Sequence, residues 1–115
     1  MTISARYLFI VSMDVEPGYE QIFNEVYDRE HIPYLMQVPG VRGVSRLKGE
    51  SFALAIGGEV KRMDAPAPVY TALYEIDGPG VLTSPEWSAA VERGRWPEQV
   101  RPYTSNRRHA LMRVI

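Results

Sequence analysis

Hydrophobic residues repeat along the chain with two different periods, which separate predicted strands from predicted helices. Arg6 to Met13 is a short run of β-branched, aromatic and aliphatic residues, and this composition favours a strand. From Tyr19 to Tyr27 the hydrophobic residues recur every three to four positions, which predicts an amphipathic helix. Pro17 and Gly18 separate the two segments, and proline suits the first turn of a helix. Pro33 is expected to end or kink this helix because it has no backbone N–H.

The rest of the chain predicts three further strands and a second helix. Val41 to Lys48 alternates between its two faces, and Val69 to Ile76 is apolar or aromatic on both faces. Ser84 and Pro85 are typical of a helix N-cap and its first residue. Arg107 to Ile115 is predicted to be the last strand. Between them, Gly49 to Pro68 stays ambiguous, since its apolar part fits either a strand or a short helix.

This order of elements, β-α-β-β-α-β, predicts a ferredoxin-like α+β fold within one domain spanning residues 1–115. We expect a four-stranded, mainly antiparallel sheet with both helices on one face. Two helices cover only one face of such a sheet, yet Arg6 to Met13 and Val69 to Ile76 are apolar on both. The open face must therefore be buried, and an identical sheet is the simplest partner. The expected assembly is a homodimer formed through the open sheet face.

Composition narrows the possible partners and compartments. The 115 residues include 13 basic and 14 acidic side chains, so the net charge of -1 argues against nucleic acid or an anionic membrane as the main partner. Cysteine is absent, which excludes disulfides and thiolate metal sites, and two histidines argue against a dedicated zinc site. The sequence contains neither a leader pattern nor a membrane-length apolar segment, so we expect a cytoplasmic protein. Its glycine-rich turns lack the residues of phosphate or dinucleotide loops, and no cofactor is expected.

Four local motifs resemble one known group of proteins. They are Tyr27-Asp28-Arg29-Glu30-His31-Ile32-Pro33, Val38-Pro39-Gly40-Val41, Ser84-Pro85-Glu86-Trp87 and Gly94-Arg95-Trp96-Pro97. Together with the element order, they resemble the dimeric α/β-barrel superfamily, and within it the EthD-like branch, whose first helix carries a His-x-Pro step. The resemblance implies relatives as different as cofactor-free monooxygenases, polyketide cyclases or dehydratases, muconolactone isomerases, haem-binding enzymes and proteins without a known activity. A shared fold does not choose among them.

His31 is the strongest candidate for a catalytic residue. On an α-helical wheel with Val26 at the origin, His31 falls at about 140°, on the flank of the apolar face, and Glu30 at about 40°, in its middle. A partly buried imidazole there is suited to carrying a proton. The alternative is that His31 caps the break at Pro33. Glu30 is a candidate base or a group that orients His31, unless the helix bends early and leaves it in solvent.

Aromatic and basic side chains supply the candidate binding residues. Tyr27, Tyr34, Tyr74, Trp87 and Trp96 are candidates to line an apolar pocket for a flat substrate, although aromatic residues at helical spacing are also typical of a core. Arg107 and Arg108 alternate along a strand, so at most one of them reaches a given pocket. We take Arg108 as the candidate for binding an anionic group, with a surface or dimer-interface charge as its alternative role.

Two main functional hypotheses follow. The first is a small cofactor-free enzyme that acts on an aromatic or polyketide-like carbonyl compound by proton transfer through His31, as in cyclisation, dehydration or isomerisation. The second is a non-catalytic dimer that binds a small apolar ligand or assists another enzyme, and the absence of a recognisable nucleophile or cofactor motif favours it. Haem binding, with His109 as a possible ligand, or a cofactor-free monooxygenase is the third hypothesis.

Overall fold

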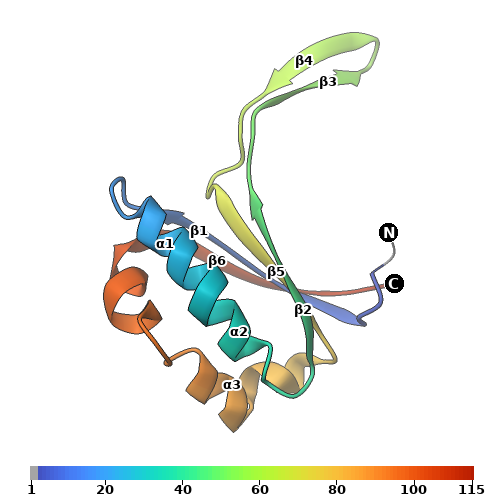
Figure 1. The fold of residues 1–115 in the computed structure, drawn as a ribbon. Coiled ribbons are helices and arrows are strands. Elements are labelled where there is room, and N and C mark those ends of the chain that lie inside the picture. The colour runs from blue at the N-terminus through green and yellow to red at the C-terminus, as the bar shows by residue number, and fades with distance from the viewer. Residues whose placement is uncertain (1–2) are drawn as a thin grey trace.

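The computed structural model describes residues 3–115 and contains a four-stranded antiparallel sheet with helices on one face. The strand order is β2-β5-β1-β6, so the first and third predicted strands lie in the centre (Figure 1). The strands of this sheet are β1 (Tyr7–Val15), β2 (Val41–Lys48), β5 (Tyr70–Ile76) and β6 (Thr104–Arg113). The predicted ferredoxin-like α+β architecture is therefore confirmed.

The first helix is longer than the sequence predicts, because it continues past Pro33. It consists of α1 (Glu20–Val26), a π-helical turn (Tyr27–His31) and α2 (Ile32–Leu35), which follow one another without a break. Within the π turn the N–H of Ile32 donates to the carbonyl oxygen of Tyr27, five residues back. Pro33 lies in the first turn of α2, where a missing N–H is tolerated.

The second helical region is more irregular than predicted. Ser84 is the expected N-cap of α3 (Pro85–Ala90), and its Oγ accepts a hydrogen bond from the N–H of Trp87 at 3.1 Å. A 3₁₀ turn precedes α3, and a π turn and a second 3₁₀ turn follow it before β6. These three turns span Pro79–Thr83, Trp96–Val100 and Arg101–Tyr103. No helix of residues 3–115 has the length and apolar character needed to cross a membrane.

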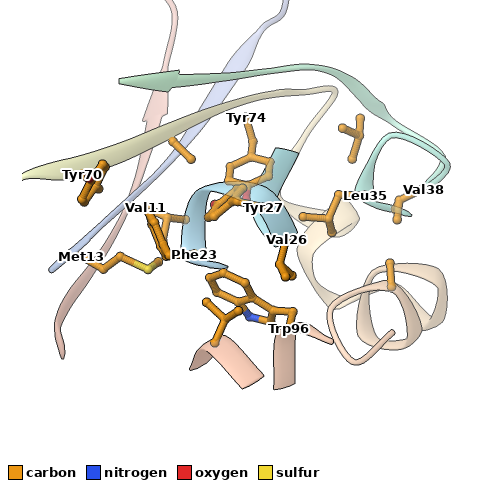
Figure 2. Packing of buried hydrophobic residues seen from close by; sticks show 14 of the residues in the cluster. Val11, Met13, Phe23, Val26, Tyr27, Leu35, Val38, Tyr70, Tyr74 and Trp96 are labelled. Atoms are coloured by element: carbon orange, nitrogen blue, oxygen red, sulfur yellow. The ribbon is translucent and has the colours of Figure 1, made fainter. Parts of the chain in front are cut away.

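The two faces of the sheet differ in what covers them. On the helix side, alternate residues of β1 and β5 pack into one core with the helices, and Figure 2 shows Tyr27 among Tyr74, Phe23 and Trp96. On the other side, Ile10 of β1 lies between Leu73 of β5 and Ala110 of β6. No element of residues 3–115 covers this open face (Figure 1).

The ambiguous segment forms a second, two-stranded sheet that projects beyond the first (Figure 1). Its strands are β3 (Phe52–Ile56) and β4 (Glu59–Met63), joined at Gly57 and Gly58. Both glycines have positive φ, as tight hairpin turns require. We call the hairpin from Phe52 to Met63 the arm. Every residue of the arm is exposed.

Candidate functional site

A pocket of about 380 Å³ lies between the helices and the helix-side face of the sheet. Its walls are mostly aromatic and aliphatic, and its polar groups are histidine, tyrosine and arginine side chains. The lining residues are Phe9, Val11, Met13, Tyr27, His31, Leu35, Tyr74, Leu82, Trp87, Val91, Trp96, Arg101, Arg107 and His109. The predicted site residues His31, Tyr27, Tyr74, Trp87 and Trp96 therefore meet around one cavity.

His31 is held in the wall of this pocket by two aromatic rings. Its ring stacks on Trp96, with 4.3 Å between the centroids and 19° between the planes, and meets the edge of Tyr27 at 5.0 Å. The side chain is 5% exposed. Its Nδ1 is the one fully buried side-chain nitrogen or oxygen of residues 3–115 without a hydrogen-bond partner. Nδ1 therefore does not cap the turn at Pro33, which was the alternative role for this residue.

The surroundings keep the imidazole uncharged. Burial lowers the pKa of His31 to about 4, because a charged ring loses its hydration there. The nearby positive charge of Arg101 acts in the same direction, and Glu92 opposes it. At neutral pH, His31 therefore presents a neutral ring that can accept a hydrogen bond or a proton.

A pair of buried tyrosines forms the wall next to His31. The hydroxyl oxygens of Tyr27 and Tyr74 are 2.5 Å apart, and the guanidinium of Arg46 lies 4.7 Å from the centre of the Tyr27 ring. Burial raises the pKa of Tyr27 to about 12 and raises that of Tyr74 as well. Both phenols stay protonated at neutral pH, so this wall carries hydroxyl groups rather than charge.

Glu30 does not line the pocket, although it adjoins His31 in sequence. It accepts hydrogen bonds from the backbone N–H of Arg95 at 2.9 Å and from Arg95 Nε at 2.5 Å. These bonds from Arg95, the backbone one first, hold the pKa of the Glu30 carboxyl below its usual value. Glu30 thus fastens the first helix to the turn that carries Trp96, the ring on which His31 stacks.

Tyr34 and Arg108 also lie outside the lining of this pocket. The ring of Tyr34 lies 4.2 Å from the guanidinium of Arg93, beside a separate shallow hollow. Arg108 pairs with Ser12, a residue that alternates with the buried Val11 and Met13 and so points to the open face. The arginine of this strand that lines the pocket is Arg107.

Three polar groups of the lining were not among the predicted site residues: Arg107, His109 and Arg101. Arg107 was set aside in favour of Arg108, and His109 was considered only as a possible haem ligand. Strand alternation could have found the first two, because His109 pairs with Val11 and both face the helices. His109 also stacks on Phe9, with 5.9 Å between the ring centroids. Arg101 lies in a 3₁₀ turn that no sequence pattern announces, and it is paired with Glu92 at 3.0 Å. Within residues 3–115, no three metal-ligating side chains converge.

Comparisons with known proteins find similarity in the fold rather than in the sequence. Neither a protein-family model nor a curated protein sequence matches the chain. Among solved structures, an EthD family protein from Bacillus halodurans matches with a TM-score of 0.57 and 15% identity, covering 95% of this chain and 99% of that one.

Two structures of MhuD also match. A point mutant with two manganese protoporphyrin IX molecules bound per active site gives a TM-score of 0.61 at 12% identity, over 95% of this chain and 94% of that one. The haem degrader MhuD from Mycobacterium tuberculosis, with two haems in its active site, gives 0.54 at 14%, over 95% of both chains. The chain shares the ferredoxin-like fold of these proteins, and the predicted resemblance to EthD-like proteins is confirmed at the level of the fold.

Proposed function

We propose that this protein is a small cofactor-free enzyme that binds a flat aromatic carbonyl compound and transfers a proton through His31. The observation that carries this proposal is the neutral imidazole in the wall of an aromatic pocket, with a buried Nδ1 that lacks a partner. A buried polar atom without a hydrogen bond costs stability, so its persistence is more typical of a functional site than of a plain core.

The size and lining of the pocket support this class of ligand. A volume of about 380 Å³ suits a compact molecule of two or three fused rings. Phe9, Tyr74 and Trp87 contact one another edge-on or tilted, with 5.7 to 5.8 Å between their ring centroids, and present aromatic surface to the cavity. Arg107 and His109 lie on β6 at the sheet side of the pocket, where they can receive the ligand's polar oxygen.

The proposed chemistry is proton transfer beside a carbonyl group. The C–H bond next to the carbonyl breaks, its electron pair moves toward the oxygen to give an enolate, and the proton passes to His31. The proton then returns to another position of the substrate, so no oxidant or reductant is consumed. Arg101 and Arg107 supply positive charge near the developing oxyanion. The same negative charge raises the basicity of His31 above its value in the empty pocket.

The other site residues act by positioning. The hydrogen bond between Tyr27 and Tyr74 fixes two rings of the wall. Glu30 fixes Trp96 through Arg95, and Trp96 in turn fixes the plane of the imidazole. Glu30 is thus proposed as a positioning residue rather than as the base, and Tyr34 and Arg108 have no proposed role in the pocket.

Hydrogen–deuterium exchange into a probe ketone tests the proposal. The probe is 1-tetralone, a bicyclic aryl ketone with exchangeable C–H bonds next to its carbonyl, incubated in D₂O and followed by proton NMR. We expect the wild type to accelerate exchange above the buffer rate, His31→Gln to lose the acceleration, and Arg108→Gln, at a residue outside the pocket lining, to keep it. Far-ultraviolet circular dichroism checks that both variants are folded.

The alternative hypothesis of a non-catalytic binding protein gives a different result in the same experiment. In that case 1-tetralone shifts the NMR signals of pocket residues, but exchange in the presence of the wild type equals exchange in buffer. This outcome would contradict the proposed enzyme and leave ligand binding as the function.

Haem binding is suggested by the likeness to MhuD, but the pocket of this chain fits haem poorly. A porphyrin with four pyrrole rings and two propionates would extend out of the open mouth of a pocket of about 380 Å³. One face of the His31 ring is covered by Trp96, and one face of the His109 ring is covered by Phe9, so each histidine is already packed against another ring. We therefore derive no step through haem, and addition of haemin is expected to produce no shifted Soret band.

We also propose that the protein works as a homodimer formed through the open sheet face. Leu8, Ile10, Leu73 and Ala110 lie on this face, and Met112 beside Leu8 is 54% exposed. A contiguous apolar surface of this kind is typical of a protein–protein interface. An isologous pairing of two sheets would bury it on both copies at once.

A further inference from the structure

We propose that the arm is a clamp that packs against the second copy of this chain and reinforces the dimer. This inference goes beyond the proposed sheet-to-sheet contact and rests on it. The arm takes no part in the pocket, and its twelve residues from Phe52 to Met63 are exposed in the single chain.

One face of the arm is largely apolar. In an antiparallel pair, directly opposite residues share a face, so Phe52 and Met63 lie on the same side as Leu54 and Ile56. These four side chains are between 41% and 54% exposed. The other face carries Ala53 and Ala55, with smaller apolar area, opposite Arg62 and Val60. Four of the five large apolar side chains of the arm therefore lie on one face, which also carries Lys61 and Glu59 opposite Leu54 and Ile56, while Val60 lies on the other face.

The arm also lacks the support that a hairpin needs. A two-stranded sheet alone in water is marginally stable, and stable examples pack against a further strand or helix. Both β3 and β4 pair only with each other, so each leaves one edge of unpaired backbone groups. A covering surface from another molecule would bury the apolar face and stabilise the hairpin.

The base of the arm is fixed to the main sheet, which sets its direction. The N–H of Gly49 donates to the carbonyl oxygen of Val69 at 2.7 Å, and the N–H of Val69 donates to Asp14 Oδ1 at 2.9 Å. Gly49 also packs closely on Pro66, because a Cβ at Gly49 would lie 2.5 Å from the Pro66 Cγ. The arm therefore leaves the sheet from an anchored base rather than from a long loose linker.

The size of the arm indicates a second copy rather than an unrelated partner. Five residues per strand and two strands give a face of roughly 17 Å by 10 Å, about 170 Å². A standard interface buries about 800 Å² on each partner, so one arm is too small to hold another protein alone. In a two-fold dimer both arms act at once, and each adds its area to the open sheet face.

Exposed apolar side chains also lie on either side of the short segment, Lys48 to Ser51, that joins the open face to the arm. Leu47 pairs with Thr71, which alternates with the buried Tyr70 and Ala72, so Leu47 lies on the open face at the end of β2 from which the arm departs. It is 47% exposed, and Phe52 at the start of the arm is 48% exposed. The arm therefore departs from the end of the face that the dimer is proposed to bury, where a second copy would lie within its reach.

Sedimentation velocity on matched double variants tests the clamp. Leu54→Ser with Ile56→Ser removes apolar area from the large face, and the control Ala53→Ser with Ala55→Ser changes the other face of the same strand. We expect the Leu54→Ser and Ile56→Ser double variant to raise the dissociation constant of the dimer by about tenfold or more. The control double variant should raise it by less than about threefold. Thermal melts verify that the main sheet remains folded in both. Equal dissociation constants for the wild type and both variants would overturn the clamp while leaving the sheet-face dimer intact.

A second measurement locates the arm directly. The chain has no cysteine, so Lys61→Cys, directly opposite Leu54 on the proposed contact face, gives a unique thiol for a benzophenone cross-linker. Isotopically mixed dimers, of which one copy is labelled with ¹⁵N, distinguish cross-links between chains from those within a chain by mass spectrometry. Cross-links between chains support the clamp, and cross-links found only within a chain contradict it. A wild type that sediments as a monomer would contradict the sheet-face dimer and the clamp together.

Discussion

Burial of the His31 ring links its protonation to the stability of the fold. Its folded-state pKa of about 4 lies below the ordinary histidine value of about 6.5. Between these two pH values His31 is therefore protonated in the unfolded chain but neutral in the folded chain. The free energy of unfolding is therefore highest, as far as His31 is concerned, above about pH 6.5. It decreases as the pH falls from about 6.5 to about 4, and below about pH 4 this contribution of His31 is lost. The shift corresponds to roughly 3 kcal/mol over this range.

Urea unfolding at pH 7 and at pH 4 measures this effect. We expect the wild type to lose up to roughly 3 kcal/mol more unfolding free energy between the two pH values than His31→Gln, whose amide does not titrate. Met36→Gln, at a 42% exposed residue just after α2 that does not titrate, is the control and is expected to lose as much as the wild type. An equal loss in the wild type and His31→Gln would contradict a buried, neutral ring at this position.

At the same scale, the different positions of Glu30 and His31 show where helical-wheel reasoning stops. The wheel assumes about 100° per residue. In the π turn from Tyr27 to His31 the hydrogen bonds span five residues, so each residue advances by less than this angle. By the end of the turn, His31 has moved from the flank into the buried face and Glu30 has moved out toward Arg95. The sequence does not reveal a π turn. His31 could therefore be chosen as a candidate from the sequence, but its nearly complete burial could not be predicted.

At the scale of elements, the turn before Trp96 depends on a close contact that only glycine permits. Gly94 has a φ of +70°, and a Cβ there would lie 2.6 Å from Glu30 Oε1 and 2.9 Å from Tyr34 Cε2. Gly18 also has a positive φ, of +90°, but a Cβ there would meet no atom within 4 Å. An alanine at Gly18 would therefore cost only backbone strain, whereas an alanine at Gly94 would cost backbone strain and steric overlap with Glu30 and Tyr34.

We expect Gly18→Ala to reduce the unfolding free energy by about 1 kcal/mol and Gly94→Ala by about 2–3 kcal/mol. The larger loss reflects the displacement of Glu30 from Arg95, and with it the support of Trp96. Chemical denaturation measures both values, and near-ultraviolet circular dichroism of the tryptophans reports the second effect. Equal losses in the two variants would mean that Glu30 and Tyr34 move aside without cost.

The strands were more predictable than the segments between them. β2 runs from Val41 to Lys48 as the alternation predicts, and β5 starts one residue later than expected, at Tyr70. Period-two patterns identify strands well because each residue independently reports its face. The region from Val91 to Tyr103 is built from short π and 3₁₀ turns, whose positions depend on tertiary contacts such as Arg101 with Glu92. For this reason the sequence did not place Arg101 in the pocket.

At the scale of the whole molecule, the two faces of the sheet differ in what covers them within one chain. The helix-side face is shared between the core and the pocket, and it is complete within one chain. The open face carries apolar side chains but has no cover within residues 3–115. The sequence already predicted that β1 and β5 are apolar on both faces, because both alternating sets of residues in these segments are mostly hydrophobic. This pattern predicts that the open face is covered by another surface. The mass of the protein in solution tests whether that surface belongs to a second copy of the chain.

Light scattering coupled to size exclusion measures this mass. Because the proposed sheet-to-sheet dimer would bury Ile10 beside Leu73 and Ala110, we expect the wild type at micromolar concentration to have twice the 13.1 kDa mass of one chain. Ile10→Lys places a charge in the middle of the contact on both copies, which is expected to give a folded monomer. The control is Met36→Lys, which changes a 42% exposed apolar residue just after α2 and should remain dimeric. A dimeric Ile10→Lys variant would contradict the open face as the interface, because two unpaired charges facing each other in an apolar contact oppose association.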